Sequence, residues 1–208
     1  MSTVRLAVPP GRAGRLWLVQ RLVVARRAAD LLDRKLRVLA AELDRARATA
    51  ERSGREWDGA CREAQRSLAR AVLLGGERAV RLAGGGADAQ VTISYTVTMG
   101  ARHPAAARYT IGEPEGWDGA AVATARQAHR AALAAAVRHA AAAAALAAIE
   151  TETRTTRYRL RAVRDRWIPA LSQALTQVEF ALEEMERDDA ARLRIVRREP
   201  TSRGAGAP

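Results

Sequence analysis

The 208-residue chain carries a formal net charge of +12, and only 4% of its residues are aromatic, which leaves little material for a thick globular core. Cys61 is the only cysteine, so a disulfide within the chain is excluded, and a lone thiol fits a reducing compartment. The N-terminus shows no apolar signal segment, and the most apolar run, residues 140–149, is shorter than the about 20 residues that cross a bilayer, so we expect a cytoplasmic protein without membrane insertion.

Residues 1–11 are expected to form an N-terminal arm, and residues 12–74 a long helix that Gly75 and Gly76 can end. Small or apolar side chains recur along it in alternating steps of four and three, and charged residues fill the positions between them. This period of 3.5 residues is typical of a helix that supercoils around another helix. The predicted seam comprises Leu18, Leu22, Ala25, Ala29, Leu32, Leu36, Leu39, Leu43, Ala46, Ala50, Ser53, Trp57, Ala60, Ala64, Ser67, Ala71 and Leu74.

Residues 75–116 are expected to form a small base region. Within residues 91–99, apolar side chains alternate with hydroxyl side chains, which is the period of a strand with one buried face. With residues 108–111 as the returning strand, this pattern predicts a hairpin at about 91–111 that has a long loop over 100–106. Because an isolated hairpin is marginally stable in water, it should pack on a helix or on a partner.

A second long helix is expected over residues 117–198, with Asp118 as a possible N-cap, and residues 199–208 are predicted to be a disordered tail. The alanine-rich first part of this helix favours helix strongly but specifies its register poorly. Its seam comprises Leu146, Ile149, Thr153, Thr156, Leu160, Val163, Trp167, Leu171, Leu175, Val178, Leu182 and Met185. From Val163 the steps are four, four and four, a stutter, and Pro169 lies inside it, so we expect the helix to bend there.

Two seams in one chain predict a mainly α fold. The expected architecture is a long antiparallel two-helix coiled coil, or shaft, of residues 12–74 and 117–198, with the small β-hairpin and its helical flanks as a central base.

The sequence gives little support for a catalytic function. Lys35, the single lysine, lies within a helix and not after a glycine-rich loop, so it cannot belong to a phosphate-binding loop. His129 and His139 are ten residues apart and miss the spacing of two zinc ligands on one helix, and Cys61 has no adjacent histidine. We therefore expect a protein that is not an enzyme and that holds no cofactor, metal or nucleotide of its own.

The excess of basic over acidic residues supports two interpretations. Arginines cover much of one segment of the second helix: Arg154, Arg157, Arg159, Arg161, Arg164 and Arg166. Such a stripe is typical of a phosphate-binding surface, which would suit a nucleic-acid-binding protein or a basic coiled-coil scaffold. It is equally typical of a solvated helix surface or of one that faces an acidic protein, and no helix-turn-helix, zinc or aromatic-platform motif accompanies it.

Both long helices carry motifs that are similar to those of a known family. The opening helix contains Pro10-x-Arg12 and the block Asp30-Leu31-Leu32-Asp33-Arg34-Lys35-x-x-x-Leu39. The second helix contains Thr155-Thr156-Arg157-Tyr158-Arg159-Leu160-Arg161-Ala162-Val163, Trp167-Ile168-Pro169 and Leu182-Glu183-Glu184-Met185-Glu186-Arg187, followed by Arg192-Leu193-Arg194-x-Val196-Arg197. In these motifs the chain resembles the central axle, or D subunit, of the V-type and archaeal-type rotary ATPases, and Lys35 falls on a family lysine position.

The resemblance implies a non-catalytic rotor subunit, present once per complex, that transmits torque between a nucleotide-hydrolysing head and an ion-translocating membrane ring. Its implied partners are the A and B subunits of the head, the small F subunit of the rotor and the subunit that adapts the axle to the membrane ring, so it would be peripheral to the membrane, with neither nucleotide nor nucleic acid bound directly. The candidate stator contacts are Arg187, Arg192, Arg194 and Arg197. The candidate packing residues of the base are Val91, Ile93, Tyr95, Val97, Tyr109 and Ile111.

Overall fold

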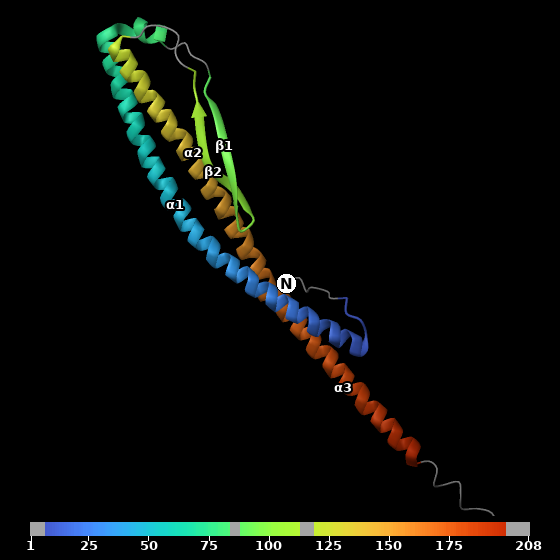
Figure 1. Ribbon diagram of the computed structural model, residues 1–208. Helices are drawn as coiled ribbons and strands as arrows, with labels where there is room; N and C mark the ends of the chain where they lie inside the picture. The colour runs from blue at the N-terminus through green and yellow to red at the C-terminus, as the bar shows by residue number, and fades with distance from the viewer. Residues whose placement is uncertain (1–6, 84–87, 113–118, 199–208) are drawn as a thin grey trace, which may run out of the picture. The chain divides into compact units, whose positions relative to one another are not determined.

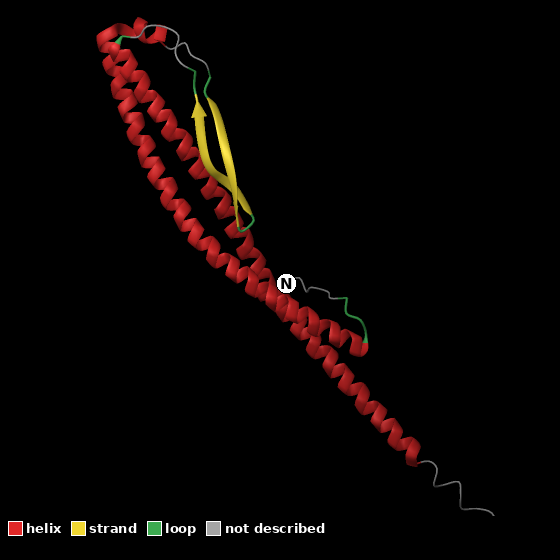
Figure 2. Ribbon diagram, viewed as in Figure 1, coloured by secondary structure: helices red, strands yellow, loops and turns green. Residues whose placement is uncertain are grey.

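The computed structural model describes residues 7–83, 88–112 and 119–198, with side chains described as far as residue 195. Three α-helices, a π-helical turn and one hairpin account for most of this part of the chain (Figures 1 and 2). Their bounds are α1 Gly11–Ala83, β1 Gln90–Thr98, β2 Ala101–Thr110, α2 Ala120–Arg161, η1 Ala162–Trp167 and α3 Ile168–Arg198. The expected mainly α fold with a small hairpin is confirmed, whereas Asp118 and the tail at 199–208 lie outside the described residues.

The chain divides into two compact units. The first consists of residues 1–34 together with 157–208, and the second of residues 35–156, so that α1 contributes to both. In each unit a segment of α1 packs against a segment from the second half of the chain.

In the first unit, a cluster of buried apolar side chains joins α1 to α3. Leu18 and Leu171 are fully buried at its centre, with Leu22 and Ala25 beside them. Ion pairs flank the cluster: Arg12 with Glu186 at 3.0 Å, Arg15 with Glu179 at 2.9 Å and Asp33 with Arg164 at 3.9 Å. Residue numbers rise along α1 as they fall along its partner, so the two helices are antiparallel here.

Gly14 allows the segment before α1 to return over the helix. A Cβ added at Gly14 would lie 2.0 Å from the carbonyl oxygen of Pro9, a distance that no side chain tolerates. Val8 can therefore pack against the same cluster that holds Leu18. Sequence reasoning assigned Gly14 no role, because nothing in its neighbourhood shows that the chain doubles back.

In the second unit, α1 and α2 are also antiparallel. Lys35 meets Glu152, Ser53 meets His139, and Ala71 packs with Val122 and Ala125. Most of the predicted seam of α1 is buried or half-buried, as a helix-pairing seam requires. Trp57 is partly exposed, and Leu74, the last seam position, is exposed because it lies at the kink described next.

The first helix continues past the predicted end through a kink. Gly76 has φ 76° and ψ 161°, which is non-helical and lies in the region that favours glycine, and the helix resumes as far as Ala83. The glycine pair thus interrupts the helix and does not end it.

The hairpin differs from the expectation in two ways. Its strands run to a two-residue turn at Met99 and Gly100, both with positive φ, so residues 101–106 of the predicted loop are strand instead. Pro104 is tolerated because the register shifts between Ser94 and Tyr95, leaving a bulge beside it.

The alternating apolar side chains of β1 were expected to form a buried face, and they do not. Every residue from Gln90 to Val97 is exposed, and only Thr98 at the turn is half-buried. An alternating pattern shows which side chains share a face, but it does not show whether anything in the same chain covers that face.

The stutter in the second seam takes the form of a π-helical turn. The N–H of Ile168 donates to the carbonyl oxygen of Val163, five residues earlier, and η1 ends two residues before Pro169. A π-helical turn is closed by a hydrogen bond between residues five apart and therefore contains more residues than an α-helical turn. It accommodates the stutter, which is the change of spacing in the seam. Leu171 consequently returns to the seam and is fully buried, while Trp167 is left partly exposed.

Candidate interaction surfaces

The described part of the chain holds no cluster of candidate metal ligands. In residues 7–83, 88–112 and 119–198, no group of three or more His, Cys, Asp or Glu side chains could hold a metal ion. A pocket of about 240 Å³ in the first unit lies between residues 8–11 and α3, and its lining of Val8, Pro9, Pro10, Gly11, Val178, Ala181, Leu182 and Met185 contains no titratable group. Three exposed surfaces of the described residues are candidate interaction sites.

The first surface is the hairpin stripe, formed by alternating apolar side chains of β1 and the first residue of its turn. Its members are between 42% and 64% exposed: Val91, Ile93, Tyr95, Val97 and Met99. Arg102 lies over the ring of Tyr95, 4.4 Å from its centroid. Four members of this stripe are the base residues proposed from the sequence, whereas the other two, Tyr109 and Ile111, are half-buried on the β2 side.

Two features attach the hairpin to the helices of its unit. Near its open end, the hydroxyl of Tyr109 donates to the carbonyl oxygen of Arg130 at 2.9 Å, and the guanidinium of Arg130 donates to the carbonyl oxygen of Gly112 at 3.3 Å. At the turn, Ala101 is buried. The hairpin is thus hydrogen-bonded to α2 near its open end, while its apolar stripe stays exposed.

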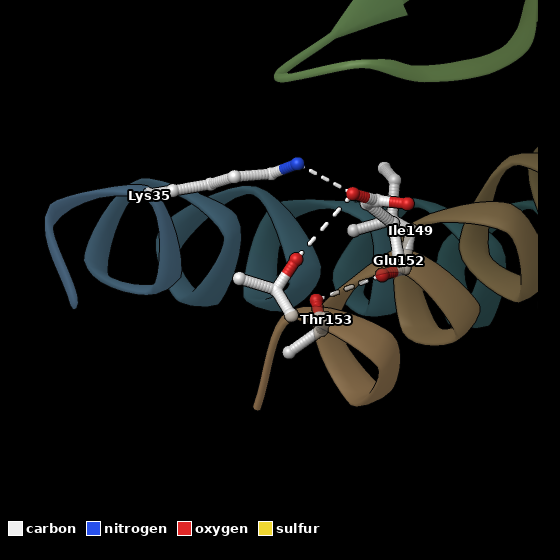
Figure 3. Close-up of polar contacts among 5 residues, drawn as sticks. Lys35, Ile149, Glu152 and Thr153 are labelled. Carbon is white, nitrogen blue, oxygen red and sulfur yellow. Dashed lines mark hydrogen bonds and ion pairs between the residues drawn. The ribbon is translucent and has the colours of Figure 1, made fainter. Parts of the chain in front are cut away.

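Beneath the turn, Lys35 joins α1 to α2. Its ammonium nitrogen lies 2.5 Å from Oε1 of Glu152, and both side chains are mostly buried, at 25% and 23% exposure (Figure 3). The hydroxyl of Thr156 donates to the same carboxylate at 3.4 Å. A Cβ added at Gly100 would lie 3.8 Å from the Lys35 nitrogen, so the lysine reaches the hairpin turn as well. The sequence prediction placed Lys35 on a family lysine position and gave no partner for it.

The second surface surrounds the kink in α1. Three leucines, Leu73, Leu74 and Leu82, are 84%, 80% and 76% exposed and are called the kink leucines below. Arginines flank them at Arg70, Arg78 and Arg81, all exposed. An exposed apolar group of this kind, rimmed by charge, marks an interaction site more often than a solvated surface.

The third surface is the C-terminal part of α3, where the stator contacts were predicted. Arg192 and Arg194 are exposed. Arg187 is exposed too, but it pairs within its own helix with Glu183 at 3.3 Å and Glu184 at 3.7 Å. The side chain of Arg197 lies outside the described residues. Arg187 is thus engaged within α3, whereas Arg192 and Arg194 face solvent.

Sequence reasoning found no role for His139, and the structure shows one. Its Nδ1 lies 3.1 Å from the hydroxyl oxygen of Ser53, and its ring stacks on Trp57 with centroids 5.4 Å apart. His129, ten residues earlier, hydrogen-bonds with the carbonyl oxygen of Ala125 in its own helix. The two histidines thus make separate contacts.

Comparison with known proteins identifies the family to which the chain belongs. A model of the family of ATP synthase D subunits matches residues 16–198, which include both helix pairs and the hairpin. The chain is also 30% identical over 209 residues to a V-type ATP synthase D subunit of Anaeromyxobacter sp. (strain Fw109-5), covering 96% of this chain and 97% of that one. The chain belongs to the family of ATP synthase D subunits.

Membership of the D-subunit family makes the chain part of an ATP synthase complex with partner subunits. One stretch within Ala120–Ile195 is apolar enough, by length and composition, to cross a membrane, and only 17% of it is buried. Within α2, Val122, Ala125, Ala132 and Ala135 are buried.

Proposed function

We propose that this chain is the non-catalytic central rotor subunit of a V/A-type rotary ATPase or ATP synthase. It would transmit torque between the nucleotide-hydrolysing head and the ion-translocating membrane ring, as one copy per complex, on the cytoplasmic side and peripheral to the membrane. Family membership over residues 16–198 is the observation that carries the proposal.

The helix pairs suit a part that must resist twisting. In each unit, side chains far apart in the sequence are joined across two antiparallel helices, by buried seams and by ion pairs such as Arg15 with Glu179 and Arg47 with Glu150. A torque applied to one helix would therefore have to break contacts with the other. Single exposed ion pairs stabilise by at most about 1 kcal/mol, so the seams carry most of this resistance.

Each exposed surface can be assigned a partner within such a complex. The hairpin stripe, apolar and flanked by Arg102, is proposed to pack on the small F subunit of the rotor. The kink leucines, with their flanking arginines, are proposed to seat in the subunit that adapts the axle to the membrane ring. Arg192 and Arg194, with Arg187 and Arg197, are proposed to meet the A and B subunits of the head.

The exposed arginines of α2 keep a second candidate function open, that of a basic scaffold or nucleic-acid-binding protein. Arg154, Arg157, Arg159 and Arg161 are all exposed. A protein that neutralises several phosphates loses affinity for nucleic acid steeply as salt rises, by a factor of about 10³ or more between 50 and 200 mM for six or more contacts.

Co-expression separates the two candidates. The full chain, tagged, is produced together with the A, B and F subunits of the same enzyme, and the purified material is assayed for stoichiometry and ATP hydrolysis. The proposal expects a stable complex with one copy of this chain, and no salt-sensitive binding of the purified chain to duplex DNA or single-stranded RNA. A chain that purifies alone but binds nucleic acid with a steep salt dependence would overturn it in favour of the second candidate.

A further inference from the structure

At its most buried positions, the middle of the helix pair in the second unit offers little that fixes its register. Between Val122 and Ile149, the buried residues of α2 are alanines: Ala125, Ala132 and Ala135. On the facing part of α1 the buried seam is made of Ala50, Ser53, Ala64, Ser67 and Ala71. Small, nearly identical side chains present the same surface at each turn, so a sliding of one helix along the other costs little packing.

One large polar side chain interrupts this uniform surface. His139 projects from α2 against Ser53, Gly54 and Trp57 of α1, and it is partly buried there. Together with Ala50, these residues have the i, i+3, i+4, i+7 spacing of the four residues that surround a hole in knobs-into-holes packing. We propose that His139 is a register clamp, a knob that positions α2 at a single place along α1.

Each residue of the hole makes a different contribution. Ser53 donates its hydroxyl hydrogen to the carbonyl oxygen of Ala50 at 3.0 Å, so its oxygen is left to accept from Nδ1–H of His139 at 3.1 Å. Gly54 provides space, because a Cβ added there would come within 3.3 Å of Cε1 of the imidazole. Trp57 covers the ring, with an interplanar angle of 23°.

No neighbouring hole on α1 provides the same three features. A slip of one heptad toward the C-terminus would place Ala60, Cys61 and Ala64 where Ser53, Gly54 and Trp57 now stand. A slip in the other direction would place Ala46, Arg47 and Ala50 there. Neither set contains the hydroxyl, the glycine or the aromatic ring. His139 therefore distinguishes one register from its neighbours where the alanines do not.

The clamp is a property of the chain alone and does not depend on the proposed function. It is tested with the full-length protein carrying spin labels at two exposed positions of the same unit, through Arg66→Cys on α1 and Thr124→Cys on α2, in a Cys61→Ser background. Pulsed electron double resonance then measures the distance between the labels. A slip of one heptad moves the helices by about 10 Å relative to each other, at about 1.5 Å per residue.

The clamp predicts one narrow distance distribution for His139 and a broadened or second distribution, displaced by up to about 10 Å, for His139→Ala. Gly54→Leu, which fills the hole while keeping the histidine, should give the same change. His129→Ala is the matched control, because it makes the same substitution on the same helix away from α1. Circular dichroism checks that helix content is retained, which alanine favours. A single unchanged distribution in His139→Ala would overturn the proposal.

Discussion

The hydroxyl group of Tyr109 on β2 donates a 2.9 Å hydrogen bond to the main-chain carbonyl oxygen of Arg130 on α2. Tyr109 thereby anchors the open end of a hairpin whose apolar stripe is covered by nothing in the described chain. A two-stranded hairpin of this kind is marginal by itself, so its few attachments to the helices should control how often it opens.

Tyr109→Phe should loosen the hairpin without unfolding the helices. Loss of one neutral hydrogen bond costs about 1 kcal/mol, which raises the rate of amide hydrogen exchange along β2 about fivefold. The exchange is followed by mass spectrometry, with Tyr158→Phe, an exposed tyrosine of α2, as the control. Equal exchange in β2 for both variants would show that the hydrogen bond does not hold the hairpin.

Lys35→Met should destabilise the second unit more than the loss of an exposed pair does. Lys35 and Glu152 are mostly buried, and the substitution leaves the carboxylate without its ammonium partner, at a cost of about 1–3 kcal/mol. Arg45→Met is the control, since Arg45 is exposed and pairs with Glu42 within one helix, a contact that contributes about 0.5 kcal/mol or less. Urea denaturation of both variants measures the difference, and equal midpoints would contradict it.

Two glycines of α1 should respond differently to the same substitution. Gly59→Ala should stabilise the protein by about 1 kcal/mol, because a Cβ there meets nothing within 4 Å and alanine favours helix. Gly54→Ala should gain less than this or lose stability, because its Cβ would press on His139. Thermal unfolding followed by circular dichroism compares them. If both variants gained the same stability, the space around His139 would be large enough for a Cβ at position 54.

Reversing the charge at the end of α3 should weaken assembly with the head. The double variant Arg192→Glu, Arg194→Glu places negative charge where the proposed stator contacts need positive charge, and we expect about a tenfold loss of affinity for the A–B head. The control is Arg55→Glu with Arg62→Glu, exposed residues of α1 in the other unit. Coupled ATP hydrolysis is measured alongside binding. Unchanged binding and hydrolysis would remove the two arginines from the proposed contact.

The kink leucines should matter for assembly and not for folding. Because Leu73 and Leu74 are more than three-quarters exposed, replacing both by Ser should change the free energy of unfolding by no more than about 0.5 kcal/mol. The same double variant should no longer bind the adaptor of the membrane ring in a pull-down. Leu31→Ser, also exposed on α1, is the control and should bind normally. Retained binding of the double variant would place the adaptor elsewhere.

Much of the helical architecture followed from the sequence because it depends on local periodicity. The seam of α1 is buried at Leu18, Leu39 and Ala71, which lie along its whole length. The break at Gly76 followed as well, since only glycine adopts its backbone angles readily. The stutter before Pro169 indicated an irregularity, although its form as a π-helical turn did not follow from the step count.

The hairpin shows where local pattern stops being informative. The alternation in β1 predicted a strand correctly, but the return strand and its two-residue turn were obscured by Pro104, which the bulge accommodates. The same alternation suggested a buried face, and that face is exposed. Whether the apolar face of a strand is buried depends on which other element packs against it. The sequence of the strand alone does not specify that element.

The sequence by itself determined that this protein is built from two long helices with pairing seams, a small hairpin and no recognisable catalytic motif, since helix period, strand period and glycine chemistry act over a few residues. Tertiary structure alone decided which side chains meet across the helices. Two sets of contacts join residues that are far apart in the sequence: Lys35 with Glu152, and His139 with Ser53, Gly54 and Trp57. An alanine-rich seam permits many registers of nearly equal packing, so these contacts emerge only when the two helices are in place.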